Sequence, residues 1–505
     1  MKVITHNAEY LTLKKNIVVL LTTLLQISLA TLLNAQSYFK PSIGDALRIS
    51  VGGQIYDARA LGMGNSNSVI NDTYSATLLN PASLGLAKKF TINTSVGLSQ
   101  YNYDAAFLQD TILGERTETI LSEAGMIIPL ASDTADNNFV LSLGYNRTKD
   151  FNSTLQFGGF NSRNTSLIEN LTSVNSYLTE QLLLSYPYYD PQTGDYISDQ
   201  TVIDNGNLNQ SGDVLEDGSV NFWSFGMAYE FAHNIFFGAS FNYSVGSYTR
   251  DGEFTESNNQ GYYSDTLRTI ADNPLTAGFQ SFYINDIKDW VFNGYDLRIG
   301  VLYRFFNFIG IGVSVKTPTI TSISEDHYFT GRSEFLTDYT VTVDTIISNK
   351  FTIQSPYEFT VGADVNIWFI TATAEATYID YTQMQYSGGL DVPQMSGLNK
   401  DIIATYTRTV NLKAGAELRL PFTGLSFRAG AMFIPLPVAD TPFEYDHKFL
   451  TAGAGITSGE GSIEFHVAAI YGFWDQVSND YGTSVSQVSE SITSYNIMGS
   501  LTLML

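Results

Sequence analysis

The sequence predicts an all-β fold: a transmembrane antiparallel β-barrel of about fourteen strands, with an N-terminal hatch, or plug, inside its lumen. Three observations predict it. Segments with apolar residues at every second position recur from about residue 90 to the C-terminus. Short and long connections alternate between these segments, and a stretch typical of an export signal precedes them all.

The composition excludes several functional classes. The chain has 505 residues, of which 50 are acidic and 26 basic, so its formal net charge is −24. Nucleic acid is not an expected partner, because its phosphates need clustered Lys and Arg side chains. Cysteine is absent, which excludes a disulfide framework and thiol chemistry. We expect no cofactor and no metal ion.

The first residues predict export. Lys14 and Lys15 precede an apolar run over residues 17–33, and small residues follow before a cleavage point expected after Ala35. The alternative is a transmembrane helix, which Gln26 and the lack of a second such run disfavour. We therefore expect the outer membrane of a Gram-negative cell as the location. The expected division of the chain is a signal peptide at 1–35, a hatch at 36–89 and the barrel at 90–505.

The alternation has the dimensions of a membrane wall. Between Tyr295 and Phe305, apolar residues occupy every second position, and Asp296, Arg298 and Arg304 lie between them. A soluble β-sandwich also alternates in this way. The two aromatic ends, however, stand roughly 25 Å apart along the membrane normal at ~3.3 Å per residue and ~40° tilt, which matches an apolar band between aromatic girdles.

Connection lengths favour the barrel over the sandwich. We expect strands at 90–104, 118–131, 137–150, 218–232, 234–249, 293–306, 308–322, 356–369, 370–383, 408–421, 424–434, 446–457, 459–474 and 492–505. Connections near Ala232-His233, Phe306-Asn307, Phe369, Phe422-Thr423 and Ser458 are very short, as periplasmic turns are. The others are longer, and the longest are the expected extracellular loops 151–217, 250–292, 323–355 and 384–407.

Several ordered motifs resemble those of one transporter family. They are Asp45-Ala-Leu-Arg-Ile-Ser50, Ala58-Arg-Ala-Leu-Gly-Met-Gly-Asn65, Leu79-Asn-Pro-Ala-Ser-Leu-Gly85, Val315-Lys-Thr-Pro318, Phe359-Thr-Val-Gly-Ala363, Ala376-Thr-Tyr-Ile-Asp-Tyr381 and Leu425-Ser-Phe-Arg-Ala-Gly430. In this set the chain resembles the FadL/TodX-type outer-membrane hydrophobic-compound transporter family, the OMPP-type transport proteins. It departs at Ser83, where the family most often has Gly.

The resemblance implies a fourteen-stranded barrel whose N-terminal hatch controls passage. The implied hatch and gating residues are Arg59, Gly62, Met63, Gly64, Asn80, Pro81 and Ala82. It further implies that a long-chain fatty acid or related hydrophobic compound is captured by the loops, enters the lumen and leaves sideways through a kinked third strand. Pro129 and the Gly158-Gly159 pair are candidate places for a break in strand pairing, and an ordinary strand-end irregularity is the favoured alternative at each.

Charged residues at lumen-facing positions form a second set of candidates. They are Arg298, Arg304, Lys316, Glu375, Lys413, Glu417, Arg419 and Arg428. Two readings stay open: the charges pair with one another across the interior, or a cationic subset receives a carboxylate head group. Apolar loop stretches are candidates to capture the ligand, notably a helical pattern from Leu167 to Leu184 and the stretch Phe279 to Phe292. The alternative for the helical stretch is that its apolar residues pack within the loop itself.

The sequence does not predict an enzyme. His466 faces the lumen beside Glu464, but no nucleophile can be placed beside them. The expected partners are a hydrophobic small molecule, outer-membrane lipid and lipopolysaccharide, around a monomeric barrel. Two alternatives remain. One is a secretion-associated barrel like PorV that binds protein partners, and the other is a structural or adhesive barrel.

Overall fold

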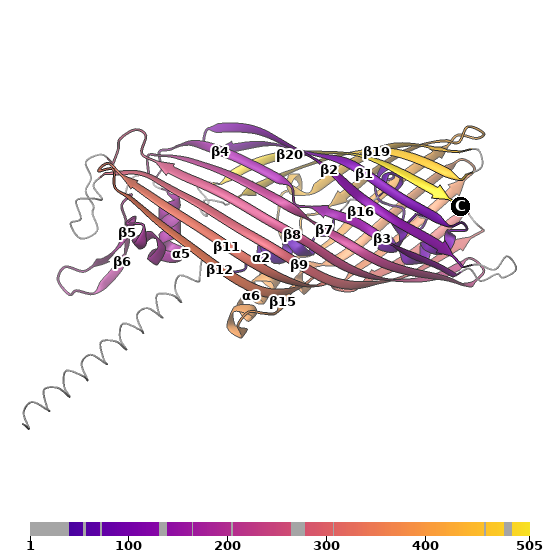
Figure 1. The fold of residues 1–505 in the computed structure, drawn as a ribbon, viewed down its shortest axis with the longest axis horizontal. Coiled ribbons are helices and arrows are strands. Elements are labelled where there is room, and N and C mark those ends of the chain that lie inside the picture. The colour runs from indigo at the N-terminus through magenta and orange to yellow at the C-terminus, as the bar shows by residue number, and fades with distance from the viewer. Residues whose placement is uncertain are drawn as a thin grey trace, which may run out of the picture.

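One antiparallel sheet closes on itself into a barrel in the computed structural model (Figure 1). The structure describes residues 40–53, 57–70, 73–130, 139–163, 165–203, 206–263, 278–306, 308–458, 461–478 and 487–505. The signal peptide predicted at 1–35 lies outside these residues. No helix in the described part of the chain is long and apolar enough to cross a membrane.

The wall is built in chain order. Its first strands are β1 (Thr91–Phe107), β2 (Asp110–Pro129), β3 (Phe139–Asp150), β4 (Ser153–Asn161), β7 (Leu208–Ala232), β8 (Ile235–Ser257) and β9 (Phe279–Phe305). The others are β10 (Ile309–Lys316), β11 (Ile320–Phe335), β12 (Thr340–Gln354), β13 (Glu358–Ile367), β14 (Ile370–Asp380), β15 (Gln385–Gly388), β16 (Arg408–Arg419), β17 (Leu425–Ile434), β18 (His447–Thr457), β19 (Ile463–Ser478) and β20 (Val488–Met504).

The barrel closes where the last strand pairs with the first. The β1–β20 ladder runs from the pair Thr91 and Met504 to the pair Ala106 and Ser489. These 18 strands make fourteen passes, because β3 and β4, β10 and β11, β12 and β13, and β14 and β15 are each two parts of one interrupted pass. The predicted fold class, a fourteen-stranded antiparallel barrel, is therefore confirmed.

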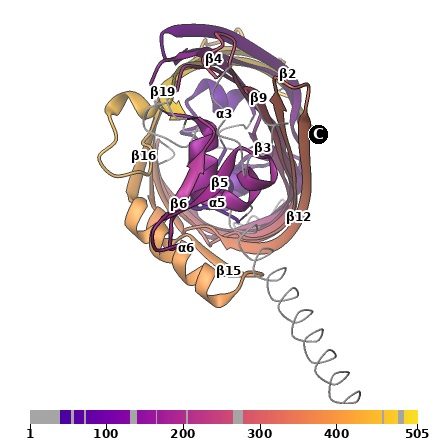
Figure 2. The ribbon, with the colours of Figure 1, turned by 90° about the vertical axis from the view of Figure 1, so that its left-hand side faces the viewer.

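Short helices lie inside the ring and at its ends. The N-terminal segment, meaning the described residues 40–53, 57–70 and 73–90, carries α2 (Ile43–Ser50), α3 (Ala58–Gly62), α4 (Ala76–Leu79) and η1 (Pro81–Leu86). Figure 2 shows α3 and α5 within the ring and α6 along its outside. The remaining elements are α5 (Leu167–Gln181), β5 (Ser185–Tyr189), β6 (Tyr196–Thr201), η4 (Tyr381–Gln383), α6 (Val392–Thr405) and η5 (Phe443–Tyr445).

The outer surface carries an aromatic row at one level. Tyr145 pairs with Trp223, Trp223 with Tyr243, and Tyr243 with Tyr295 across four neighbouring strands. The last three are exposed on the outer face. Aromatic rings at a common height are typical of a membrane–water interface, because one side of each ring is apolar and the other meets polar groups.

A second aromatic level lies at the end of the barrel with the short turns. Phe306, Trp368 and Phe422 stand in those turns and are almost fully exposed. Between the two levels, outward side chains such as Ile299 and Leu297 are apolar and exposed. This is the surface of a barrel that crosses a membrane, with the height predicted from the spacing of aromatic residues along β9.

Two prolines interrupt neighbouring passes near the level of the aromatic row that includes Tyr295. Pro318 separates β10 from β11, and Pro356 separates β12 from β13, because proline has no N–H to give to a ladder. The two breaks hold each other: the Thr319 N–H donates to Ser355 Oγ at 2.8 Å, and the Ser355 N–H donates to the Thr319 carbonyl at 3.0 Å.

Two of the regions expected to be loops, 250–292 and 323–355, are mostly strand where the structure describes them. The β8–β9 ladder continues to the pair Ser257 and Ser281, and the β11–β12 ladder fills most of 323–355. The stretch 105–117 is a tight hairpin of β1 and β2. Phe279 to Phe292 and His327 therefore lie on strands rather than in loops. The strand ends were predicted from apolar alternation, and that alternation stops before the strands do. Above the membrane, a strand no longer needs an apolar outer face.

The other two expected loops contain local structure. Range 151–217 holds β4, α5, the β5–β6 hairpin and the first part of β7. Range 384–407 holds β15, which pairs with β12, and α6 (Figure 2). The end of the barrel that carries α5 is called the α5 end below, and the opposite end is the short-turn end.

Candidate functional site

The N-terminal segment contacts the inner wall at several places, and one of them lies on β18 and β20. The Ala58 N–H donates to Ser500 Oγ at 2.6 Å. The Gly64 N–H donates to Thr451 Oγ1 at 3.1 Å, and that hydroxyl donates to the Gly62 carbonyl at 3.2 Å. The turn predicted from the motif at residues 58–65 is thus fixed to the wall by its own backbone.

Only glycine fits at the tightest point of this contact. Gly64 has a φ of +61°, and a Cβ there would lie 2.8 Å from the Ala414 carbonyl oxygen and 2.9 Å from the Ala431 nitrogen. The facing strand also has a glycine at this contact, because a Cβ on Gly415 would lie 2.3 Å from the Met63 carbonyl oxygen. Backbone therefore packs directly on backbone.

We expect Gly64→Ala to loosen the segment. The added Cβ meets backbone atoms that cannot rotate away, so the free energy of unfolding should fall by about 1–3 kcal/mol. Gly499→Ala is the matched control, because a Cβ there has nothing within 4 Å. Urea titrations of both variants measure the difference, and an equal effect at the two positions would contradict the packing argument.

Another contact is the Asn-Pro-Ala step. Asn80 Nδ2 donates to the Val301 carbonyl at 3.4 Å, and Asn80 Oδ1 accepts from the Ala82 N–H at 3.1 Å. A Cβ on Gly238 would lie 2.2 Å from the carbonyl carbon of Pro81. Ser83, which departs from the family pattern, donates from Oγ to the Asn80 carbonyl at 2.8 Å. All seven candidate hatch residues are buried against the wall; that they block the lumen stays a prediction.

One buried carboxylate, that of Glu417, contacts three arginines among the candidate residues. Glu417 is fully buried and accepts from Arg428 Nε at 2.6 Å, with Arg59 Nε at 3.5 Å. Arg419 also contacts Glu417, but most of its side chain is exposed. Arg428 and His466 lie 3.2 Å apart, and His466 Nε2 lies 3.1 Å from Glu464. This cluster ties the N-terminal segment, through Arg59, to β16 and β17.

Two further arginines reach from the wall to the same segment. Arg298 pairs with Glu358 at 3.2 Å and donates to the Leu79 carbonyl at 3.3 Å. Arg304 pairs with Asp364 at 3.3 Å and donates to the Val69 carbonyl at 3.2 Å. Each guanidinium thus divides its donors between a carboxylate of β13 and the backbone of the N-terminal segment.

The two lysines of the candidate set are paired as well. Lys316 lies 2.9 Å from Glu358, and Lys413 lies 3.3 Å from Glu375. The acidic partners Glu358 and Asp364 were missed in the sequence. Their position was available: both share the inward parity of Thr360 in the strand segment quoted for the family resemblance, and that parity would have found them.

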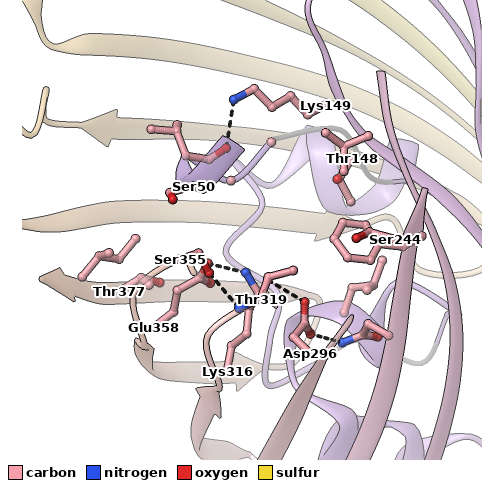
Figure 3. Close-up of a pocket in the computed structure, with 18 of the residues that line it drawn as sticks. Ser50, Thr148, Lys149, Ser244, Asp296, Lys316, Thr319, Ser355, Glu358 and Thr377 are labelled. Carbon is pink, nitrogen blue, oxygen red and sulfur yellow. Dashed lines mark hydrogen bonds and ion pairs between the residues drawn. The ribbon is translucent and has the colours of Figure 1, made fainter. Parts of the chain in front are cut away.

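A cavity of about 120 Å³ lies inside the barrel between α2 and the N-terminal turn at Leu78 and Leu79. Its lining is mostly polar and comes from strands around half of the ring. Figure 3 shows Lys149 extending from one side, and the Lys316–Glu358 pair and Asp296 on the other. Asp296 accepts from Asn242 Nδ2 at 2.7 Å, so the floor of the cavity is a connected polar network.

Helix α2 closes the cavity on the side toward the α5 end. Lys149 Nζ donates to the carbonyls of Arg48 at 2.6 Å and Val51 at 3.0 Å, where the last turn of α2 has unpaired carbonyls. At the other end of the helix, the Tyr386 hydroxyl donates to the Ser42 carbonyl at 2.6 Å. The helix is therefore held by strands and loops that are far from it in sequence.

Asp45 makes this attachment sensitive to acid. Burial alone would raise the pKa of Asp45, but Lys288 at 3.3 Å, Arg48 at 3.1 Å and hydrogen bonds from Ser42 hold it below its ordinary value. A carboxyl with a lowered pKa in the folded state stabilises the fold above its unfolded pKa. The contribution is lost as the pH falls through the folded-state pKa.

We therefore expect α2 to lose protection from hydrogen exchange below about pH 4. Asp45→Asn should show the loss at neutral pH already, because the amide has no charge for Lys288 and Arg48. Hydrogen–deuterium exchange of the peptide that contains α2 measures it. Asp195→Asn, on the exposed turn between β5 and β6, is the control, and protection in Asp45→Asn equal to that of the unmodified protein would contradict the expectation.

The α5 end is filled by an apolar core. The predicted helix at Leu167 is confirmed as α5, and its buried side chains pack against inward-facing aromatic residues of β8, β9 and β11 such as Phe254, Phe282 and Phe329. Glu256 anchors the helix, because it accepts from the Leu167 N–H at 2.7 Å and from Ser166 Oγ at 2.6 Å. The inner wall is thus apolar here and polar in the membrane region.

The wall is interrupted beside the cavity. The β2–β3 ladder stops at the pair Glu123 and Asn146, although β2 continues alongside β1 to Asp110. Just beyond, the β3–β7 register shifts between Arg147 and Lys149, which leaves Thr148 as an extra residue. Side chains bridge the gap; Arg147 Nη2, for example, lies 3.0 Å from Glu118.

The interruption lies in the third pass, which the resemblance implies is kinked, but not at the residues singled out in the sequence. Pro129 pairs with Val140 at the end of β2, and the Gly158-Gly159 pair lies within the β4–β7 ladder. Neither therefore marks the break. A bulge places two residues of one strand opposite one residue of its partner, so it depends on the register between the two strands. The sequence of a single strand does not show that register. Within the described ranges, no group of three or more His, Asp or Glu side chains is arranged to hold a metal ion.

Comparison with known proteins finds solved structures of similar fold. No family model matches the sequence, and no curated protein matches it either. The toluene transporter TodX of P. putida superposes with a TM-score of 0.51 at 14% identity, over 90% of this chain and 99% of that one. A FadL homologue of Pseudomonas aeruginosa does so with a TM-score of 0.53 at 11% identity, over 90% and 100%.

Identities this low establish the fold and nothing finer. The comparison does reach almost the full length of both solved chains, so it includes the barrel and the segment before it. This chain is therefore a closed β-barrel of the same architecture as the toluene transporter TodX and the FadL homologue.

Proposed function

We propose that the protein is a passive transporter that carries hydrophobic small molecules through the outer membrane. The α5 end then faces outward and the short-turn end faces the periplasm. The observation that carries the proposal is the order of three features inside the barrel. From the α5 end inward these are the apolar core under α5, the cavity, and the break in the wall beside that cavity. The solved barrels of like fold include one described as a toluene transporter.

Capture at the α5 end follows from the hydrophobic effect. An apolar molecule gains about 0.8 kcal/mol for each CH₂ group that leaves water, so a water-filled pore would offer it no advantage. The core around Leu171, Leu178 and Phe282 offers apolar surface inside the mouth of the barrel. Movement of α5 away from this core would open the first step of the route.

We propose the gap between β2 and β3 as the exit. Thr148 and Lys149 line the cavity and also form the bulge that ends the β2–β3 ladder. Polar atoms without a hydrogen-bonding partner among the described residues lie there, including Asp150 Oδ2 and both amide atoms of Asn152. A wall held there by side chains rather than by a backbone ladder opens at lower cost. The gap begins one residue beyond the aromatic level of Tyr145, so a molecule leaving sideways emerges at the outer edge of the membrane without crossing the periplasmic half of the lumen.

Mass spectrometry of the purified barrel tests the proposal. Extraction of detergent-purified protein should release enriched hydrophobic molecules. A variant with Glu256→Ala, whose α5 lacks its anchor, should retain fewer of them. An unloaded barrel that co-purifies with protein partners would instead favour the secretion-associated alternative, and an unloaded barrel that binds whole cells would favour the adhesive one.

A further inference from the structure

One side of the barrel lacks strands toward the α5 end. The β14–β16 ladder stops at the pair Asp380 and Arg408, and β17 and β18 have only 10 and 11 residues. β12 extends beyond that pair, and from Thr340 to Phe351 it pairs with β11 alone. Among the strands that the structure describes, none therefore completes the wall next to this part of β12.

β15 and α6, residues 385–405, lie along the outside of the barrel at this place and are called the side panel (Figure 2). β15 pairs with β12 at three positions. α6 is held to β15 by one side chain, because Asn399 Nδ2 donates to the Tyr386 carbonyl at 3.0 Å and Asn399 Oδ1 accepts from the Tyr386 N–H at 2.8 Å. After the helix, Tyr406 and Val438 form a single bridge. A few contacts thus stand where a full ladder would close the wall.

The inner face of the side panel meets α2 where the wall is missing. Leu398 and Ile402 of α6 belong to the same apolar cluster as Ile43 and Leu47 of α2, and the two helices are in direct contact. Just after α6, the Tyr406 hydroxyl donates to the Ile43 carbonyl at 3.1 Å. A helix outside the barrel and a helix inside it therefore touch with no strand between them.

The same apolar cluster borders the cavity. Phe292, Ile379 and Tyr381 belong both to the cluster and to the lining of the cavity, as do Ile49 and Val51 at the end of α2. Apolar contacts therefore run without interruption from the inner face of the side panel to the cavity.

The outer face of the side panel lies beside the lipid-facing surface. Tyr378 and Val410 are both exposed on the outside, and they pair only two positions before the β14–β16 ladder ends. α6 exposes 73% of Val392 and 62% of Ile403. Exposed apolar side chains this close to the apolar band of a barrel contact lipid. The side panel therefore stands between the outer leaflet and the cavity.

We propose that the side panel covers a side entrance, through which long-chain hydrophobic molecules dissolved in the outer leaflet reach the cavity. The inference rests on the transport function proposed above and adds a second entrance to the one under α5. Returning a dissolved molecule to water costs about 0.8 kcal/mol for each CH₂ group, so a long chain gains most from a route that avoids water. Opening the panel breaks a three-position ladder and the Asn399 contact, and no complete strand has to leave the wall.

A disulfide between β12 and β15 locks the panel. A Cβ on Gly388 would lie 3.9 Å from the Thr352 Cβ, within the span of about 3.5–4.5 Å that disulfides bridge. The chain has no cysteine of its own, so Thr352→Cys with Gly388→Cys supplies the only two thiols. The pair Gly158→Cys with Ser211→Cys is the matched control, because it joins the complete β4–β7 ladder with a Cβ separation of 3.4 Å.

Photolabelling from the membrane tests the entrance. The barrel is reconstituted in phosphatidylcholine vesicles that contain a diazirine derivative of dodecanol, and labelling of the α2 peptide is measured by mass spectrometry against a lipid-facing peptide around Ile299. We expect α2 to be labelled in the reduced Thr352→Cys, Gly388→Cys protein and labelled at least about fivefold less after oxidation. Oxidation of the control pair should change nothing.

A second variant tests the hold of the panel without a disulfide. Asn399→Ala removes both contacts to Tyr386, so labelling of α2 should rise by at least about twofold. Lys400→Ala, at the exposed next position of α6, is its control and should leave labelling unchanged.

The outcomes separate the two proposals. Equal labelling of α2 in the oxidised and reduced protein, or no labelling in either, would overturn the side entrance. Entry of a fluorescent alkyl alcohol that is still faster than in protein-free vesicles would then leave transport through the α5 end standing. Entry no faster than in protein-free vesicles would overturn the transport function itself.

Discussion

Deletion of Thr148 is expected to reduce the uptake of hydrophobic solutes by at least about tenfold while the barrel still folds. Thr148 is the extra residue between the pairs Arg147 with Asn221 and Lys149 with Val220. Without it, β3 keeps both pairs in a regular ladder with β7, and the local bend that separates β3 from β2 is removed. The proposed exit then closes. Uptake of a fluorescent alkyl alcohol into vesicles measures the effect.

A second deletion provides the matched control. Phe231 is the extra residue of another register shift, between Glu230 and Ala232 near the short-turn end. Its removal should change uptake by less than about twofold, since it lies at the opposite end of β7 from the residues that pair with Arg147 and Lys149. If both deletions lower uptake equally, or if the Thr148 deletion leaves it unchanged, the gap between β2 and β3 is not the exit.

Glu417→Ala is expected to destabilise the barrel by about 3–5 kcal/mol. The substitution leaves Arg428 and Arg59 buried beside a missing carboxylate, and the side chain of Arg428 is 2% exposed. Because Arg59 belongs to the N-terminal segment, the same change should free that segment from β16. We expect a raised ion conductance in planar bilayers together with the lower free energy of unfolding.

Substitutions of Arg419 and Arg428, which both contact Glu417, supply the controls. Arg419 contacts the same carboxylate, but 59% of its side chain is exposed, so Arg419→Ala should cost only about 0–1 kcal/mol. Arg428→Ala should resemble Glu417→Ala. Equal small effects for all three substitutions would show that the cluster does not hold the N-terminal segment, and unchanged conductance in Glu417→Ala would argue against a plug.

The sequence predicted the barrel well where the lipid dictates the pattern. Between Tyr295 and Phe305, every outward position must be apolar, so the alternation is visible in one strand without knowledge of its neighbours. The count of fourteen passes followed from this. The prediction failed above the membrane, where strands such as β12 have Thr and Asp on their outer side and the pattern fades.

Sequence parity gave the inward direction of the charged candidate residues but not which of them pair. Parity along a strand places Lys316 and Arg298 inward, yet it does not show that both meet Glu358, which is about 40 and 60 positions away along the chain. The break at Thr148 and the docking of α2 on Lys149 depend on register between strands and on contacts between distant segments. Such features follow from the closed fold, and no local sequence pattern carries them.

The most direct test of the account is the rate at which a hydrophobic alcohol enters lipid vesicles that contain the protein, compared with vesicles that lack it. Transport through the α5 core, the cavity and the gap beside Thr148 predicts a faster, saturable entry that falls when an unlabelled alcohol of the same chain length competes and when Thr148 is deleted. An entry rate equal to that of protein-free vesicles would contradict the account.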